Sequence, residues 1–404
     1  MITKSNNFLI YTTLLIVILF IAISLAQTLT RYNLNQQIAI SDRIIGVNEK
    51  VYPSNEFKKN KEATVSQYFP GTAFFISPIN YLISSDKIKN YIYASLAVIT
   101  HLLFILILAK IHCGLSKSKL FFSFFSILIF SMLITKSYTF YSLEFKPDTI
   151  AFTIGLWALY FFDKAKNENS FKVTKIVLSG IFFGLGIAFK QQYISFIGGI
   201  LLFNFISLNK NLLIFTLSLL IILFFILINF NNFEFFWFWN LETFKDDGFM
   251  SLNEYLYTNK FLFFNFFLFS FIFLNISYEK IDKEKIIFFS KKIIYLIKNQ
   301  YTWVLLPASL SCFLSGYKVG GNIANTGLGM LLLFPVFFSI VSEIKMKWLK
   351  IFLIFGILNI APFAIKSLQN YKYFYDLSDD FKKIEIKNND ILLYGSTFYT
   401  IVKK

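Results

Sequence analysis

Long apolar segments recur along almost the whole of this chain, and they constrain its fold more than any other feature. A helix of about 17–25 mostly apolar residues crosses the hydrocarbon core of a bilayer, with its backbone polar groups paired inside the helix. Eleven segments of this kind lie near 8–26, 91–109, 120–135, 149–162, 173–189, 193–208, 212–230, 261–277, 301–316, 327–342 and 351–365. The weakest two, 149–162 and 173–189, fit tilted or partly re-entrant helices. The sequence therefore predicts an all-α polytopic membrane protein with about 11 transmembrane helices.

The charges agree with this class and indicate its orientation. Only 15% of the 404 residues are charged, against roughly 25% in soluble domains. The net charge of +16 is spread between the apolar segments, so a nucleic-acid partner is not indicated. Alternate loops hold 18 lysines and the short loops on the other side hold six. The positive-inside rule then predicts a cytoplasmic N-terminus and an extracytoplasmic C-terminus.

Two domains are expected from this topology. Residues 1–365 form the membrane domain, and residues 366–404 form a short extracytoplasmic tail. The first extracytoplasmic loop, 27–90, is the longest interruption in the first half of the chain, and we expect it to carry short interfacial helices. The aromatic and acidic loop 231–260 suits a helix lying on the membrane, and the basic loop 279–298 suits an amphipathic helix on the cytoplasmic surface.

The first loop supplies the candidate catalytic acid. Asp42 follows the first apolar segment and precedes the turn element that contains Tyr68. A carboxylate at a membrane–water boundary can act as general base for a hydroxyl acceptor. Glu49, Glu56 and Glu62 follow in the same loop as further candidates, and for each of the four acids the alternative is a solvated loop acid. Tyr68 is a candidate substrate-binding residue beside Asp42.

A second group of ionisable residues lies at the start of segment 149–162. Glu144, Lys146 and Asp148 surround Pro147, which suits the first turn of a helix because its missing N–H group is not needed there. Asp148 would complement the positive end of that helix, and capping alone would explain it. The functional alternative is that the acid and the base hold a polar head group.

Two further lysines occupy the extracytoplasmic ends of later segments. Lys190, followed by Gln191, either snorkels to the interface or contacts a phosphate. Lys318 precedes a Gly- and Asn-rich stretch with Asn322, which either forms a tight turn or cradles an anion. Of the remaining features, Gly180 and Gly184 are spaced for close helix packing, His101 suits a packed polar residue, and His112 is expected in a loop.

These stretches carry a resemblance to a known family. The K-P-D-x-x-A element at 146–151, the stretch SGIFFGLGIAFKQQ at 179–192 and KVGGNIAN at 318–325 resemble motifs of the C superfamily of integral-membrane glycosyltransferases. That superfamily includes protein O-mannosyltransferases and aminoarabinose transferases. The similarity covers most of residues 1–345. Each motif is short, and their order and common sidedness carry the resemblance.

The resemblance implies a GT-C-like fold in a bacterial inner (plasma) membrane and a polyprenyl-phosphate-linked sugar as donor. The acceptor would be a lipid, a glycan or a protein on the extracytoplasmic face. Asp42 would be the base or acceptor-orienting acid, and Lys190 or Lys318 would neutralise the donor phosphate. Asp42 lies about 16 residues past the first segment, further than in many members, and the paired Asp-Glu of the mannosyltransferases is absent.

The sequence therefore predicts a membrane glycosyltransferase that uses a lipid-linked donor. An O-antigen polymerase or ligase would also handle lipid-linked glycans, although key arginines near a late outer loop are then expected, and the two arginines here are at 31 and 43. A lipid-linked-glycan transporter or flippase would call for charges near the membrane midplane. No cofactor is indicated, and a requirement for a divalent metal ion is left open.

Overall fold

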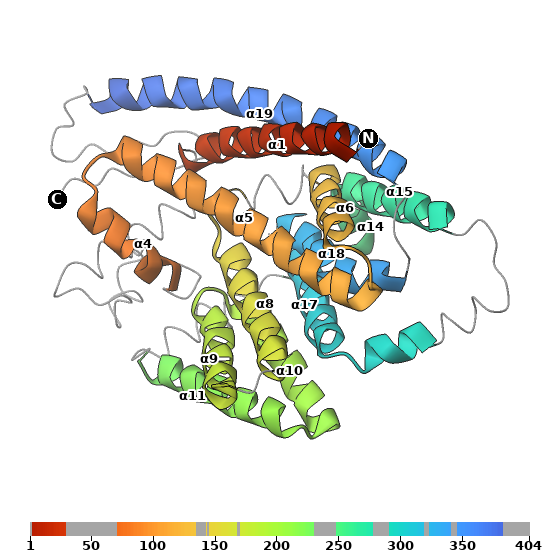
Figure 1. Ribbon diagram of the computed structural model, residues 1–404. Helices are drawn as coiled ribbons and strands as arrows, with labels where there is room; N and C mark the ends of the chain where they lie inside the picture. The colour runs from red at the N-terminus through yellow and green to blue at the C-terminus, as the bar shows by residue number, and fades with distance from the viewer. Residues whose placement is uncertain are drawn as a thin grey trace.

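The fold is described from a computed structural model of the chain, which covers residues 2–29, 71–134, 143, 145–167, 170–229, 248–277, 291–318, 323–340 and 346–382 (Figure 1). Within these ranges every regular element is a helix. The α-helices are α1 Ile2–Leu29, α4 Gly71–Leu82, α5 Asp86–Ser116, α6 Leu120–Leu133, α8 Pro147–Ala165, α9 Lys172–Leu185, α10 Ile194–Ser207, α11 Lys210–Asn229, α14 Leu252–Thr258, α15 Lys260–Ser277, α17 Gln300–Tyr317, α18 Ile323–Phe337 and α19 Met346–Lys382. Short 3-10 turns form η1 Gly186–Ala188, η2 Gln191–Tyr193 and η4 Phe338–Ile340.

The all-helical prediction is confirmed for this part of the chain, and each of the eleven predicted segments overlaps one of its α-helices. Two helical stretches, Lys87–Ser116 and Trp348–Gln369, are long and apolar enough to cross a membrane. Other apolar helices are shorter, such as the 14-residue α6, which spans about 21 Å against a hydrocarbon core of about 30 Å. The number of membrane crossings therefore stays a prediction.

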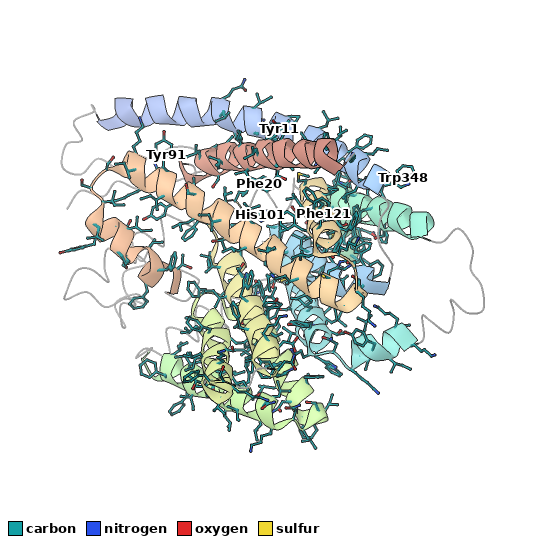
Figure 2. The ribbon with its side chains drawn as sticks, in the orientation of Figure 1. Tyr11, Phe20, Tyr91, His101, Phe121 and Trp348 are labelled. Carbon is teal, nitrogen blue, oxygen red and sulfur yellow. The ribbon has the colours of Figure 1, made fainter. Side chains whose placement is uncertain are left out.

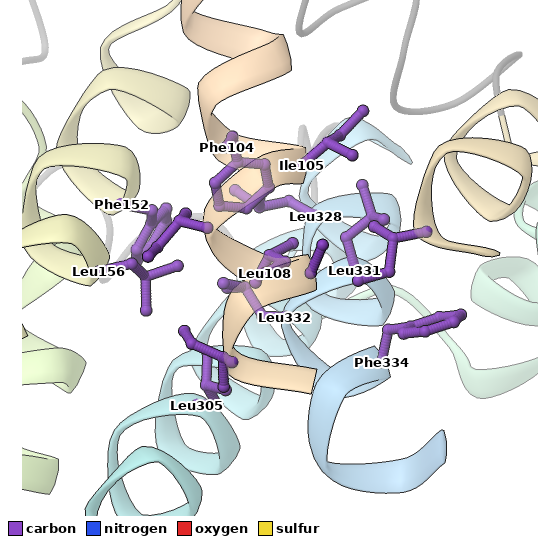
Figure 3. Packing of buried hydrophobic residues seen from close by; sticks show 14 of the residues in the cluster. Phe104, Ile105, Leu108, Phe152, Leu156, Leu305, Leu328, Leu331, Leu332 and Phe334 are labelled. Carbon is purple, nitrogen blue, oxygen red and sulfur yellow. The ribbon is translucent and has the colours of Figure 1, made fainter. Parts of the chain in front are cut away.

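Helix α5 is the central element of the bundle. It runs diagonally through the molecule and contacts α1, α6, α8 and α18 (Figure 1). Leucine, isoleucine and phenylalanine side chains from α5, α8, α17 and α18 interlock in one continuous core, which Figure 3 shows around Leu108 and Leu332. Because these helices present apolar side chains to one another along several turns, packing rather than individual helix propensity holds them together.

Helices α1 and α19 lie side by side along one flank of α5 (Figure 1). His101 of α5 is fully buried there, and its ring meets the ring of Phe20 edge-on at 5.3 Å (Figure 2). This agrees with the packed polar role expected for His101. The opposite faces of several helices carry exposed apolar side chains, including Tyr11, Phe205 and Phe264. Such apolar outer surface is unusual for a protein surrounded by water.

Short helices occur where the loops were expected to lie on the membrane surface. Helix α4 falls within 27–90, α14 within 231–260, and a helix over 291–297 within 279–298. Two boundaries differ from the prediction. Helix α5 continues to Ser116 and buries His112, which the sequence placed in a loop. Helix α19 continues past 365 to Lys382, because its amphiphilic last turns give no helix-stopping signal.

Glycines allow the closest approaches between helices. A Cβ atom at Gly180 would lie 2.4 Å from the carbonyl oxygen of Phe215 on α11, and one at Gly184 would lie 2.3 Å from Ile222. The predicted packing role of Gly180 and Gly184 is thus confirmed. Helix α10 approaches α17 in the same way, since a Cβ at Gly199 would lie 2.1 Å from the carbonyl oxygen of Trp303.

The neighbouring glycines of α10 provide a matched test of this packing. Gly199→Ala forces the new methyl group onto backbone, so we expect it to destabilise the fold by about 1–3 kcal/mol. At Gly198 a Cβ meets nothing within 4 Å, so Gly198→Ala is expected to be neutral or stabilising by up to about 1 kcal/mol. Thermal unfolding of the two variants in detergent measures the difference. Equal unfolding temperatures for the two variants would contradict the α10–α17 contact.

Candidate functional site

The start of α8 places Asp148 through an unusual local backbone. Phe145 has a φ of 45°, a left-handed conformation that is costly for a bulky residue. The Phe145 side chain is buried, and its ring centroid lies 6.1 Å from the ring centroids of Phe75 and of Tyr93. Lys146 is then extended, as expected before proline, and Pro147 begins the helix. Asp148 therefore lies in the first turn of α8, buried among apolar neighbours.

Lys190 lies at a break between two 3-10 turns. Helix α9 ends at Leu185, η1 follows over Gly186–Ala188, and η2 begins at Gln191. The backbone N–H of Tyr193 donates to the carbonyl oxygen of Lys190 at 3.1 Å, which sets the turn that leads into α10. The break directs the lysine side chain into the bundle, where the residue is only 5% exposed.

Asp148 and Lys190 form a buried ion pair. The Nζ atom of Lys190 is 3.0 Å from Oδ1 of Asp148, and the side chains are 6% and 11% exposed. Taking both charges out of water is costly, and the cost is recovered only through their mutual attraction and further hydrogen bonds. A pair of this kind at the end of an apolar bundle is therefore a candidate functional site.

Helix α17 lies against the same site. Nε2 of Gln192 donates to Oγ of Ser315 at 2.6 Å, and Cys312, one turn earlier on that helix, is within electrostatic range of both Asp148 and Lys190. The carbonyl side of the Gln192 amide is buried without a hydrogen-bond partner among the described residues. The ion pair is thus enclosed by α8, the 186–193 connection and α17.

Helix α4 closes the site from the side of the first loop. A Cβ at Gly71 would lie 2.4 Å from the carbonyl oxygen of Ala188, so the start of α4 contacts the backbone just before Lys190. The hydroxyl group of Thr72 is buried there and has no hydrogen-bond partner in the described part of the chain. Tyr193 lies two turns deeper, fully buried, with its hydroxyl group against Gly155 of α8.

Lys318 follows α17 and anchors a neighbouring segment. It forms a β-bridge with Phe249, and the N–H of Met250 donates to the carbonyl oxygen of Tyr317 at 3.1 Å. The rings of Phe249 and Tyr317 stack at 5.4 Å. Lys318 is thus one turn beyond Ser315 at the same end of the bundle as Asp148 and Lys190.

The structure brings together part of the site that the sequence predicted. Asp148 and Lys190 meet directly, Lys146 precedes the pair, and Gln191 lies in η2 beside it. The remaining predicted residues, Asp42, Tyr68, Glu144 and Asn322, lie outside the described residues. Sequence reasoning did not assign Thr72, Gln192, Tyr193, Cys312 or Ser315. The second glutamine after Lys190 was the available signal, and Tyr193 directly follows it in η2. Thr72, Cys312 and Ser315 stand on apolar helices without a motif.

Comparison with protein families, with curated proteins and with solved structures finds no match for this chain.

Removal of one partner of the ion pair is expected to destabilise the fold strongly. Lys190→Met leaves the Asp148 carboxylate buried without its partner, and the expected loss is about 3–5 kcal/mol. The double variant Asp148→Asn with Lys190→Met should recover most of that loss because no charge remains to be buried. Unfolding by heat in detergent gives the changes in unfolding free energy for Lys190→Met, for Asp148→Asn and for the double variant. Additive effects of the two single changes would show that the residues do not interact.

Proposed function

We propose that the chain is a membrane-embedded glycosyltransferase that moves a sugar from a polyprenyl-phosphate carrier to a lipid, glycan or protein acceptor on the extracytoplasmic face. The observation that carries this proposal is the buried pair between Asp148 and Lys190. Both residues belong to the stretches that resemble the C superfamily, and that resemblance gives Lys190 as one of two lysines that would neutralise the donor phosphate. The start of α4, which lies within the first loop, contacts the backbone beside Lys190.

Two observations support a position in the membrane. Two helical stretches are long and apolar enough to cross it, and phenylalanine, leucine and isoleucine side chains cover the outer faces of several others. With a cytoplasmic N-terminus, the start of α8, the 186–193 connection and the end of α17 all lie on the extracytoplasmic side. The lipid carrier would reach them from the bilayer.

The proposed chemistry is a displacement at the anomeric carbon of the sugar. Asp42 accepts the proton of the acceptor hydroxyl as its oxygen forms a bond to the anomeric carbon, and the bond between that carbon and the phosphate oxygen breaks. Polyprenyl phosphate leaves with an added negative charge. A lysine already held in an apolar site stabilises that charge without reorganisation, and Lys190 suits this role. Asp148 orients the lysine and would yield part of its contact to the phosphate.

The position of the pair argues against the transporter alternative. Asp148 lies in the first turn of α8 and Lys190 beside the first turn of α10, so both charges are at helix ends. Between the two ends of these helices the described core is formed by aromatic and aliphatic side chains such as Phe152, with hydroxyl groups such as Thr153, and the buried charged residues of the described part of the chain are Asp148 and Lys190. Transport through this bundle would call for charged groups near its middle.

A transfer assay tests the proposal. Purified protein in nanodiscs is incubated with radiolabelled polyprenyl-phosphate sugars, and release of polyprenyl phosphate is measured. Asp42→Asn removes the base and is expected to lower turnover by about 10²–10⁴-fold. Lys190→Gln combined with Asp148→Asn removes both charges of the pair and is expected to lower turnover by about 10²–10³-fold.

The matched control is Lys87→Gln, which removes an exposed lysine at the same end of the bundle and should retain wild-type turnover. Full turnover of Asp42→Asn would eliminate Asp42 as the base. Full turnover of the charge-free double variant would eliminate the ion pair as the donor site.

A further inference from the structure

A second polar cluster lies at the other end of α8. Asp163 is fifteen residues after Asp148, about 22 Å away along the helix axis. Lys166 donates from Nζ to Oδ1 of Asp163 at 3.2 Å and to Oε1 of Gln300 at 2.7 Å. Nε2 of Gln300 donates to the same carboxylate at 3.1 Å. The triad joins α8 to the start of α17, and the transfer reaction proposed above does not use it.

A cavity of about 200 Å³ opens beside this triad, where α8, α10, α11 and α17 end or begin. Its polar lining consists of Asp163, Lys166, Ser207, Asn209, Lys298, Asn299, Gln300 and Tyr301. Ser207, Asn209 and Lys298 are exposed, so a solute can enter. The volume is below the range of about 300–1,000 Å³ typical of drug-sized ligands, which favours a small group.

The lining presents more hydrogen-bond donors than acceptors. Asn209 and Asn299 cap α11 and α17 through their side-chain oxygens, at 2.9 Å from the N–H of Asn211 and 3.0 Å from the N–H of Tyr301. Their amide NH₂ groups bond to nothing else among the described residues. Lys298 forms no ion pair within the described ranges, and Lys166 uses two of its three ammonium hydrogens. The starts of α11 and α17 add positive potential.

The charges of the lining also favour an anion. Lys166 balances Asp163, so Lys298 leaves the cavity with one positive charge in excess. Burial lowers the pKa of Lys166 from its ordinary value, while the charge of Asp163 raises it. A negatively charged ligand in the cavity would raise the pKa of Lys166 in the same way as Asp163 does. The carboxylate of Asp163 is the one lining group that would repel such a ligand.

The surroundings indicate where this anion comes from. The helix over 291–297 leads directly to Lys298 and exposes Ile293, Ile294 and Ile297, as an interfacial helix does. The indole N–H of Trp303 donates to the carbonyl oxygen of Ile297 at 2.7 Å, and tryptophan is enriched at the level of lipid head groups. On the proposed topology, with a cytoplasmic N-terminus, this places the cavity at the depth of the lipid phosphate groups on the cytoplasmic side.

We propose that this cavity binds a phosphate group at the cytoplasmic surface, presented either by an anionic phospholipid or as free phosphate. Lys298 and Lys166 supply the charge, and the amide groups of Asn209 and Asn299 supply directed donors. The site is separate from the transferase site at the other end of α8. A bound phosphate group would link the ends of α8, α10, α11 and α17 to one another.

Lipid retention tests this proposal on the full chain. Protein is extracted from nanodiscs that contain phosphatidylglycerol and phosphatidylcholine, and bound lipid is counted by native mass spectrometry. Lys298→Gln should retain phosphatidylglycerol about tenfold less well than the wild type, since one charge-assisted hydrogen bond is lost. Asp163→Asn should retain it more strongly. Lys164→Gln, an exposed lysine outside the cavity, should match the wild type.

A second arm distinguishes the source of the phosphate. Inorganic phosphate is added to delipidated protein in detergent, with sodium chloride at equal ionic strength as control, and thermal unfolding is followed. Stabilisation of the wild type but not of Lys298→Gln shows that free phosphate is sufficient. Retention of phosphatidylglycerol without an effect of free phosphate assigns the site to the lipid. The proposal is overturned if Lys298→Gln and Lys164→Gln behave alike with both probes.

Discussion

The contact between Asp148 and Lys190 is the interaction on which the site depends. An ammonium and a carboxylate that are almost completely removed from water are tolerated only as a pair, so the elements that carry them are fixed relative to one another. Asp148 ties the start of α8 to the break between η1 and η2 at Lys190. The Gln192–Ser315 bond extends the connection to α17, and Gly71 brings α4 against the same backbone.

Most of the fold follows from the sequence because an apolar environment leaves few solutions for the backbone. Each predicted segment overlaps an α-helix since apolar runs of this length satisfy their hydrogen bonds internally. The ends of helices were less predictable. His112 was expected in a loop, yet α5 continues past it to Ser116, and the His112 ring nitrogen Nδ1 finds a hydrogen-bond partner in Ser123 of α6 at 2.9 Å. Such a partner depends on tertiary contacts.

The site, like the fold, could be predicted in part from the local sequence, and the rest depends on contacts between distant segments. Asp148 after Pro147 and Lys190 after an apolar run are visible as charges at helix ends, and their sidedness follows from the lysine distribution. That they meet at 3.0 Å, and that Gln192 bonds to Ser315 of α17 beside them, depends on which helices pack together. Thr72 carries no local signal because a single hydroxyl group on an apolar helix is also common in plain cores, and Tyr193 lies in the short turn η2, which the sequence did not predict. Asp42 and Tyr68 lie outside the described residues, so their part in the site is still a prediction.

The central claim is that a lipid-linked phosphate is held beside Lys190. Photocrosslinking tests it most directly, with a polyprenyl phosphate analogue that bears a photoreactive group next to the phosphate, followed by mass-spectrometric mapping of the labelled peptides. The account predicts labels in the 186–193 connection and at the end of α17, and their loss with excess unlabelled polyprenyl phosphate. Labels confined to other helices, or labels that the competitor does not reduce, would contradict it.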